Sequence, residues 1–237
     1  MFKYTRMVQT SEVGVNHHIR PFDLINMIQD LEGLHLDGLI SENNKGEEPF
    51  YIVLNFRYVH VISWPKFKDM LKLRTHTFNT TPFYGYRNTI IYNEKEEPVV
   101  LTYSVGSFIK PDTLTPHRMS KKALALLVDE TPFPMNYQGR KIQTEGFKDT
   151  NISETLYVRP SFIDYNQHLN NAYYVDFAAN LLSNDVSFNT IVCEYRYPYM
   201  LGDKIVLSLM RKEDNYLVVF LGENDKIYAL IEFKNES

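Results

Sequence analysis

The octapeptide DYNQHLNN, Asp164 to Asn171, decides the expected fold, because a related segment lies 150 residues earlier in the chain. The earlier segment is GVNHHIRP, Gly14 to Pro21, and its Asn16 and His18 match the third and fifth residues of the later one. An extended run precedes each segment (YTRMVQT, then TLYVRPSFI), and apolar residues at helical spacing follow it. This recurrence predicts a duplicated unit.

Each helical segment is followed by four runs typical of strands, separated by turn residues. The runs are 51–62, 70–78, 86–92 and 99–109 in the first copy, and 190–197, 204–210, 216–221 and 227–233 in the second. Phe56-Arg57-Tyr58 also aligns with Tyr195-Arg196-Tyr197. One long helix followed by an antiparallel sheet that wraps it is an α+β arrangement, here expected twice. We therefore predict an N-terminal domain over residues 1–120, a linker over 121–150 and a C-terminal domain over 151–237.

Composition excludes several classes of protein. The chain has 237 residues, of which 44% are hydrophobic and 23% charged, and it has no apolar run near the roughly 20 residues of a membrane span. The first residues, MFKYTRMVQTSEVG, lack the apolar core of a secretion signal. A net charge of −4 and the absence of a glycine-rich phosphate loop argue against nucleic acid and nucleotide cofactors. We expect a cytoplasmic protein without a cofactor.

The residues best suited to chemistry are Asp164, Asn166 and His168. They place a carboxylate, an amide and an imidazole at i, i+2 and i+4, just before a helix. Unpaired N–H groups at a helix start could stabilise the oxyanion that forms when a carbonyl is attacked. Asp164 could act as the base for a water or as the nucleophile, with Asn166 and His168 orienting its partners.

The same residues also suit a purely structural role. Asp and Asn are common in turns and at helix N-caps, and Asn170 or Asn171 is a plausible cap. The first copy keeps Asn16 and His18 but has Gly14 where the second has Asp164. A turn tolerates either residue, whereas glycine has no group for catalysis, so the hypothesis is one active site and one degenerate copy.

The segment FIDYNQHLNNAYYVDF resembles the D-x-N-x-H-[VL]-N-N signature of the acyl-acyl carrier protein (acyl-ACP) thioesterase family, of the bacterial type. EVGVNHH, the helix with Leu31 to His35, the Trp64-Pro65 turn and Ser107 to Asp112 fall where that family has similar features. The resemblance covers nearly the whole chain. It implies two tandem hotdog domains, each a long helix wrapped by an antiparallel sheet, and hydrolysis of fatty acyl-ACP to free fatty acid and carrier protein, which ends fatty acid synthesis. It also implies that Asp164, Asn166 and His168 are catalytic.

The chain departs from this family at one place. Many members carry a glutamate, and plant members a neighbouring cysteine, shortly after the strand that reads E-Y-R. Here Pro198 lies near the expected acid, while Cys193 comes several residues too early. We interpret Cys193 as a small buried residue and Glu194 as a solvated or ion-paired one.

Other binding sites are weakly indicated. A single cysteine excludes an internal disulfide and cysteine-based zinc sites, and the seven histidines form no HExxH motif, so we predict no metal. Four basic residues in or near the linker could contact an acidic carrier protein, or could simply be solvated: Lys121, Lys122, Arg140 and Lys141. A homodimer is compatible with the sequence, because hotdog sheets pair within or between chains.

Three alternatives to acyl-ACP hydrolysis share this pattern. An acyl-CoA thioesterase would use the same site without a carrier-protein surface. A hotdog dehydratase would eliminate a β-hydroxyl and use no hydrolytic water. A non-catalytic acyl-chain-binding hotdog protein would bind lipid and tolerate the loss of Asp164.

Overall fold

The structure, a computed structural model, describes residues 1–43, 50–126, 129–183 and 185–236 and divides into two compact units. Unit 1 consists of Met1–Ile19 and Asn26–Gln138, and unit 2 of Arg20–Ile25 and Gly139–Ser237. Each unit combines a helix with five antiparallel strands, so the predicted α+β repeat of strand, helix and four strands is confirmed. No helix in the described ranges is long and apolar enough to cross a membrane.

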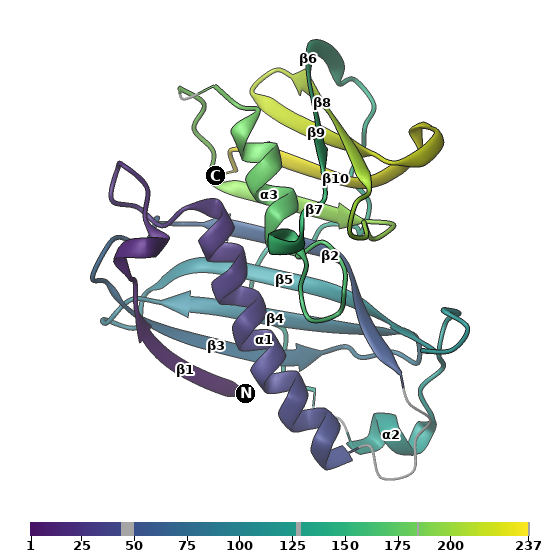
Figure 1. Ribbon diagram of the computed structural model, residues 1–237. Coiled ribbons are helices and arrows are strands. Elements are labelled where there is room, and N and C mark those ends of the chain that lie inside the picture. The colour runs from purple at the N-terminus through teal and green to yellow at the C-terminus, as the bar shows by residue number, and fades with distance from the viewer. Residues whose placement is uncertain (44–49, 127–128, 184, 237) are drawn as a thin grey trace. The chain divides into compact units, whose positions relative to one another are not determined.

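In unit 1 the helix lies across one face of the sheet. The strands are β1 (Phe2–Met7), β2 (Tyr51–Val61), β3 (Met70–Phe78), β4 (Tyr84–Tyr92) and β5 (Pro98–Ile109), in the order β1-β3-β4-β5-β2. Helix α1 (Pro21–Asn43) crosses them (Figure 1). Its proline at the first position and Asp23 in the first turn favour helix initiation. Within unit 1 its buried face carries Ile28 and Leu31.

Unit 2 repeats this order with a shorter helix. Its strands are β6 (Lys148–Tyr157), β7 (Thr190–Tyr195), β8 (Lys204–Lys212), β9 (Asn215–Leu221) and β10 (Ile227–Lys234), in the order β7-β10-β9-β8-β6. Helix α3 (Asn171–Asn180) buries five residues, so it is apolar on most sides as the sequence indicates: Ala172, Tyr174, Val175, Phe177 and Ala178. The remaining elements are α2 (Lys121–Leu126) and three short 3₁₀ turns, η1 (Thr10–Glu12), η2 (Pro160–Phe162) and η3 (Glu223–Asp225).

Backbone hydrogen bonds confirm the duplication. The Gly14 N–H donates to the His18 carbonyl at 2.9 Å, and the Asp164 N–H donates to the His168 carbonyl at the same distance. In both turns the fourth residue has a positive φ, 61° at His17 and 65° at Gln167. The offset of 150 positions therefore holds through the turn and up to the first helical residue.

One detail of the predicted repeat is wrong. The N–H groups of Ile62 and Ser63 both donate to the Val99 carbonyl, and those of Arg196 and Tyr197 both donate to the Tyr228 carbonyl. Arg196 is thus the counterpart of Ile62. The aromatic-arginine-aromatic similarity misled the alignment, because Arg57 and Arg196 do not occupy equivalent positions along their strands.

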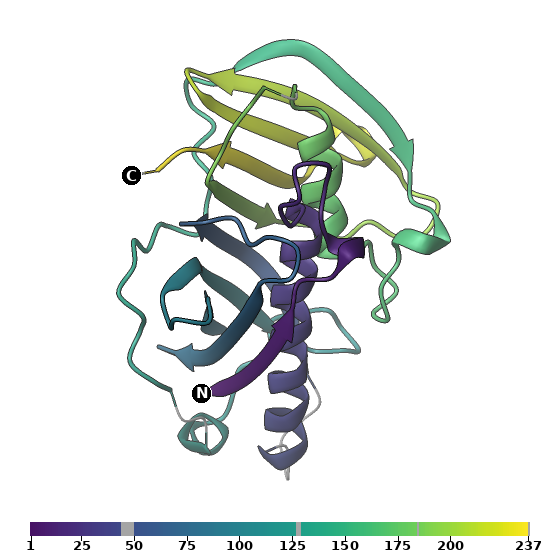
Figure 2. The ribbon, with the colours of Figure 1, turned by 90° about the vertical axis from the view of Figure 1, so that its left-hand side faces the viewer.

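The segment after α2 covers the other face of the unit 1 sheet, away from α1 (Figure 2). The Asn88 side-chain carbonyl accepts hydrogen bonds from the Phe133 N–H at 3.0 Å and from the Tyr137 hydroxyl at 2.8 Å. Tyr103 bonds both backbone groups of Gln138. Residues 129–138, the covering segment, are therefore part of unit 1.

Candidate active site

The candidate residues Asp164, Asn166 and His168 lie in one tight turn between η2 and α3. The Gln167 N–H donates to the Asp164 carbonyl at 3.0 Å, and an isolated bridge joins Ile163 to Leu169. This turn brings the three predicted side chains into one short loop. Asn166 is exposed, and Asp164 and His168 are partly exposed.

The Asp164 carboxylate is held through one oxygen. Its Oδ1 accepts hydrogen bonds from the N–H groups of Asn166 at 2.8 Å and His168 at 3.3 Å. In the first copy Gly14 has no such oxygen, and Asn16 Oδ1 accepts the His18 N–H at 3.0 Å instead. The backbone turn is the same in both copies, so the carboxylate is not needed to form it. Fixing Oδ1 orients the carboxylate while leaving Oδ2 for a substrate or a water.

The other two side chains are available for binding. Within the described ranges, neither the Asn166 amide nor the His168 imidazole has a hydrogen-bond partner, although the backbone around both is ordered by the turn. An amide and an imidazole together supply donors and an acceptor. They suit a carbonyl group or a water that the carboxylate also contacts.

The start of α3 is capped as one of the two predicted residues implies. Asn170 is the N-cap, and its side chain accepts the Ala172 N–H at 2.9 Å. The Tyr173 N–H donates to the Asn170 carbonyl at 3.0 Å. These two donors are therefore occupied, and the expectation of a freely available row of N–H groups is wrong for Ala172 and Tyr173. The cap satisfies these groups because Asn is itself a preferred N-cap residue.

Aromatic packing fixes the turn against its helix. The Phe162 ring lies 4.7 Å from the Tyr173 ring and 5.3 Å from the Phe177 ring, and Phe22 lies 4.8 Å from Tyr173. The Tyr173 hydroxyl donates to the Ser161 carbonyl at 3.2 Å. Such ring pairs add roughly 0.5–1.5 kcal/mol each beyond their burial. These contacts anchor the segment before the turn to the helix after it.

A second loop, residues 197–203, is hydrogen-bonded to the end of the turn. The Leu169 N–H donates to the Tyr199 carbonyl at 2.9 Å, and the fully buried Tyr199 ring stacks on Tyr228 with centroids 4.5 Å apart. Burial raises the pKa of both Tyr174 and Tyr199, and the Asp164 carboxylate adds to the upward shift of the Tyr174 pKa. These tyrosines stay neutral beside the turn. No sequence pattern pointed to Tyr199, because it is an ordinary aromatic residue next to a proline.

The acid and thiol near the end of β7 are not free to react. Cys193 is fully buried, as the sequence interpretation states. Glu194 is also buried: it forms an ion pair with Arg196 at 2.7 Å and accepts the Ile142 N–H at 2.7 Å. Asp203, in the loop beside Pro198, accepts the Met200 N–H at 2.8 Å, just as Asp69 accepts the Lys66 N–H in unit 1. Glu194 and Asp203 are thus both held by other groups of the protein.

Two further expectations concern binding. The described ranges contain no group of three His, Cys, Asp or Glu residues that could hold a metal ion. The four basic residues in and near the linker are all exposed: Lys121, Lys122, Arg140 and Lys141.

Comparison with known proteins places the chain in a family. Residues 1–127 match the family model of the acyl-ACP thioesterase N-terminal domain, and residues 146–228 match that of the C-terminal domain. A search of curated proteins finds no match.

Solved structures agree on the fold over the whole chain. An acyl-ACP thioesterase from Bacteroides thetaiotaomicron aligns with a TM-score of 0.86 at 17% identity, covering 99% of this chain and 97% of its own. A 12:0-ACP thioesterase from Umbellularia californica gives 0.82 at 14% identity, covering 98% and 96%. A putative oleoyl thioesterase from Lactobacillus plantarum gives 0.76 at 15% identity, covering 98% and 93%. The architecture is a double hotdog, and the chain belongs to the acyl-ACP thioesterase family, enzymes that hydrolyse the thioester of fatty acyl-ACP.

Proposed function

We propose that unit 2 carries the hydrolytic centre, with Asp164, Asn166 and His168 as its catalytic residues, and that unit 1 holds a degenerate copy. The observation that supports this is the contrast between two turns of the same backbone geometry. One has a carboxylate held by two N–H groups, and the other has Gly14 at the same position. Because the turn forms without the carboxylate, its presence in one copy points to chemistry.

In the reaction, Asp164 acts as the general base. Oδ2 takes a proton from a water whose oxygen attacks the thioester carbonyl carbon, and the resulting oxyanion is stabilised by donors from Asn166 and His168. The C–S bond then breaks, the electron pair leaves with sulfur, and the proton held by Asp164 neutralises the departing thiolate. The products are a free fatty acid and the thiol of the carrier.

Direct attack by Asp164 is the second mechanism that this geometry allows. It would form an acyl-enzyme anhydride, which water then cleaves. A single turnover in H₂¹⁸O reveals an anhydride that water cleaves at the aspartyl carbon; cleavage at the fatty acyl carbon would label the fatty acid in both mechanisms. With Asp164 as base, the label appears only in the fatty acid; cleavage of an anhydride at the aspartyl carbon would leave the label in the peptide containing Asp164.

The working context follows the sequence expectations. We propose acyl-ACP rather than acyl-CoA as the preferred substrate, a cytoplasmic location, and either a monomer or a homodimer as the active form. The exposed residues Lys121, Lys122, Arg140 and Lys141 are candidates for contact with the acidic carrier protein.

The first experiment measures fatty acid release by the purified protein from a panel of acyl-ACPs and the matching acyl-CoAs. Asp164→Asn is nearly isosteric, and we expect it to lower kcat by roughly 10²- to 10⁴-fold while the protein still binds acyl chains. His168→Ala should also lower kcat, whereas its counterpart in the other copy, His18→Ala, provides the matched control and should keep wild-type turnover.

The outcomes separate the alternatives. Full turnover in Asp164→Asn would refute the assigned role. Faster hydrolysis of the CoA esters would favour the acyl-CoA thioesterase alternative. Acyl binding without hydrolysis of either thioester would indicate the non-catalytic binding protein.

A further inference from the structure

One peptide group of unit 2, that of Tyr199, is hydrogen-bonded on both sides. Its carbonyl accepts the Leu169 N–H at 2.9 Å, at the end of the candidate turn. Burial raises the pKa of Tyr174, and a hydrogen bond with the backbone of Tyr199 offsets part of this rise. A backbone hydrogen bond lowers the pKa of a phenol when it stabilises the charged oxygen, so the Tyr199 N–H is the donor. The Tyr199 peptide therefore links α3 to the residue that follows His168.

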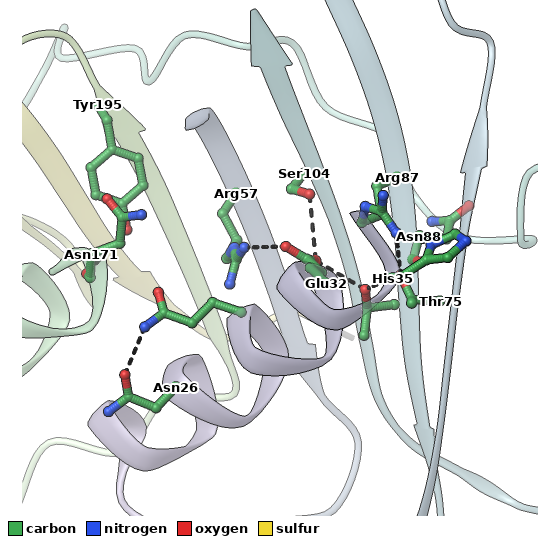
Figure 3. A network of polar contacts seen from close by, with 12 residues as sticks. Asn26, Glu32, His35, Arg57, Thr75, Arg87, Asn88, Ser104, Asn171 and Tyr195 are labelled. Atoms are coloured by element: carbon green, nitrogen blue, oxygen red, sulfur yellow. Dashed lines mark hydrogen bonds and ion pairs between the residues drawn. The ribbon is translucent and has the colours of Figure 1, made fainter. Parts of the chain in front are cut away.

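Tyr174 is held firmly in the interior of unit 2. It is 2% exposed, and its ring lies 5.2 Å from Tyr195, 5.2 Å from Phe220 and 5.9 Å from Tyr199. The Tyr195 hydroxyl in turn donates to the Asn171 carbonyl at 3.3 Å, at the start of α3 (Figure 3). A ring packed on several sides keeps one rotamer, so the Tyr174 hydroxyl has a fixed place. We call the following residues the tyrosine cluster: Tyr174, Tyr195, Tyr199 and Tyr228.

The first copy of the repeat closes its turn with the same backbone bond but cannot form the second one. The Ile19 N–H donates to the Pro65 carbonyl at 2.8 Å, as the Leu169 N–H donates to the Tyr199 carbonyl. Pro65 is therefore the counterpart of Tyr199. Proline has no N–H, so the donor of the second bond is missing from the first copy.

The acceptor is missing as well. The residue 150 positions before Tyr174 is Leu24, which has no hydroxyl group. The shared carbonyl at the end of the strand in each copy gives the counterparts of two further members of the tyrosine cluster, Val61 for Tyr195 and Val99 for Tyr228. A turn of the same geometry thus forms without any of these hydroxyls. They occur only in the copy that also has the Asp164 carboxylate.

We propose that Tyr174 is a positioning residue for the hydrolysis, which acts through the Tyr199 peptide on the end of the catalytic turn. Leu169 directly follows His168, so a fixed Leu169 N–H fixes the backbone that carries the imidazole. The His168 N–H donates to Asp164 Oδ1 at 3.3 Å, so the same support orients the carboxylate. Displacing a catalytic group by about 1 Å can cost roughly 100-fold in rate. This inference rests on the proposed hydrolytic centre of unit 2.

The test uses Tyr174→Phe in the full-length protein, which removes the hydroxyl and keeps the ring. Tyr228→Phe is the matched control: it removes another hydroxyl of the tyrosine cluster, while the carbonyl that receives the Arg196 and Tyr197 N–H groups stays in place. For each variant, thermal unfolding checks the fold, fatty acid release from acyl-ACP gives kcat and KM, and hydrogen exchange followed by NMR reports on the Leu169 and Tyr199 amides. Both variants are also made in the Asp164→Asn background.

We expect Tyr174→Phe to lower kcat at least about tenfold and to change KM by less than about twofold, because the buried hydroxyl acts on the turn and not on the bound substrate. The Leu169 and Tyr199 amides should exchange faster in this variant. Tyr228→Phe should keep the kcat and the exchange rates of wild type. In the Asp164→Asn background, Tyr174→Phe should lower the residual rate much less, because residues that act as a unit are not additive.

A folded Tyr174→Phe variant with wild-type kcat would overturn the proposal, even if its amides exchanged faster. An equal loss of kcat in Tyr228→Phe would also overturn it, because the effect would then be one of general packing. If Tyr174→Phe does not fold, hydrogen exchange of wild type decides: a protected Tyr199 amide supports the bond to Tyr174, and an unprotected one refutes it. Full turnover in Asp164→Asn would instead refute the hydrolytic centre itself, so the two failures have different signatures.

Discussion

At the scale of single residues, comparing the two copies of the turn distinguishes side chains that form the turn from a side chain that the turn does not need. Asn16 and Asp164 both accept the N–H of the histidine at the end of the turn, although they occupy different positions in it. The backbone therefore has two ways of satisfying the same group, and only one of them leaves a carboxylate facing outward. This is why the substitution of Gly14 for Asp164 carries information that the shared Asn and His do not.

Cys193 provides a test at this scale. It is fully buried in β7, on the side of the strand that carries Tyr195. We expect Cys193→Ser to lower the free energy of unfolding by about 1–3 kcal/mol, because a hydroxyl replaces a weakly polar thiol in the core, and to leave kcat unchanged. Denaturant titration and fatty acid release measure both. A large loss of kcat in a folded variant would restore a thiol mechanism.

His35 should give the protein a pH-dependent stability. Its pKa is about 4 in the folded chain, against a reference value of 6.5, so the unfolded chain binds a proton at higher pH than the folded one. The stability that comes from keeping His35 neutral is fully present above about pH 6.5. It is lost as the pH falls toward 4, so the free energy of unfolding decreases over this range. His76, whose pKa burial also lowers, acts in the same direction.

His35→Gln keeps an acceptor for Arg87 but removes the titration. We expect the free energy of unfolding of this variant to fall less steeply between pH 7 and pH 4.5 than that of wild type, as followed by urea denaturation. Identical slopes would show that His35 does not titrate differently in the two states.

At the scale of elements, two glycines predict opposite effects of the same substitution. Gly33 lies inside α1, where an added Cβ meets nothing within 4 Å. Gly222 lies between β9 and η3, where an added Cβ would overlap the Tyr228 ring. That ring is stacked on Tyr199, whose carbonyl accepts the Leu169 N–H at the end of the candidate turn, so it has little room to move.

Gly33→Ala should therefore raise the free energy of unfolding by roughly 0.5–1 kcal/mol, because alanine loses less conformational freedom in a helix. Gly222→Ala should lower it by about 1–3 kcal/mol through overpacking. Thermal and urea unfolding of the two variants side by side checks the pair. Stabilisation by Gly222→Ala would mean that the Tyr199–Tyr228 stack is loosely held.

The secondary structure was largely predictable, because the spacing of apolar residues and the residue types of turns depend on neighbours in the chain. The third strand was predicted with its observed bounds, Met70–Phe78, and others were off by one to a few residues at their ends. The largest error lies in the second copy, where Thr155 to Ile163 was expected to be extended. The strand instead runs over Lys148–Tyr157, and a 3₁₀ turn follows from Pro160. Proline at the start of that turn fixes φ and ends the strand.

At the scale of the whole molecule, the covering segment shows how a proline-containing linker becomes part of a folded unit. Asn88 is fully buried and receives hydrogen bonds from Phe133 and Tyr137, and the Tyr137 ring lies 5.0 Å from Tyr103. The prolines suit it because its backbone forms scattered bonds, from Glu130 to the Thr77 carbonyl and from Phe133 to the Asn88 side chain, rather than a continuous strand ladder.

Asn88→Ala should release this segment. Loss of the side-chain carbonyl leaves the Phe133 N–H without its acceptor and removes the bond between the Tyr137 hydroxyl and the sheet, although that hydroxyl can still donate to the Phe133 carbonyl. Limited proteolysis should then cut within residues 129–138 several times faster than in wild type. Tyr137→Phe removes only one of the two bonds and should show an intermediate rate. Equal cleavage rates in all three proteins would show that the aromatic contacts alone hold the segment.

The sequence by itself determined the repeat, the order of elements, an N-cap at Asn170 or Asn171 and the short segment that holds Asp164, Asn166 and His168, since each depends on residues close together in the chain. Tertiary structure decided that Glu194 is ion-paired and buried, that Tyr199 supports the turn, and that Glu32, Arg57 and Arg87 meet inside unit 1. The spacing of Glu32, Arg57 and Arg87 along the chain carries no periodic signal. Their contact arises only when a helix packs across strands that are far apart in sequence. Burial then strengthens the interaction between their charges, which composition does not show.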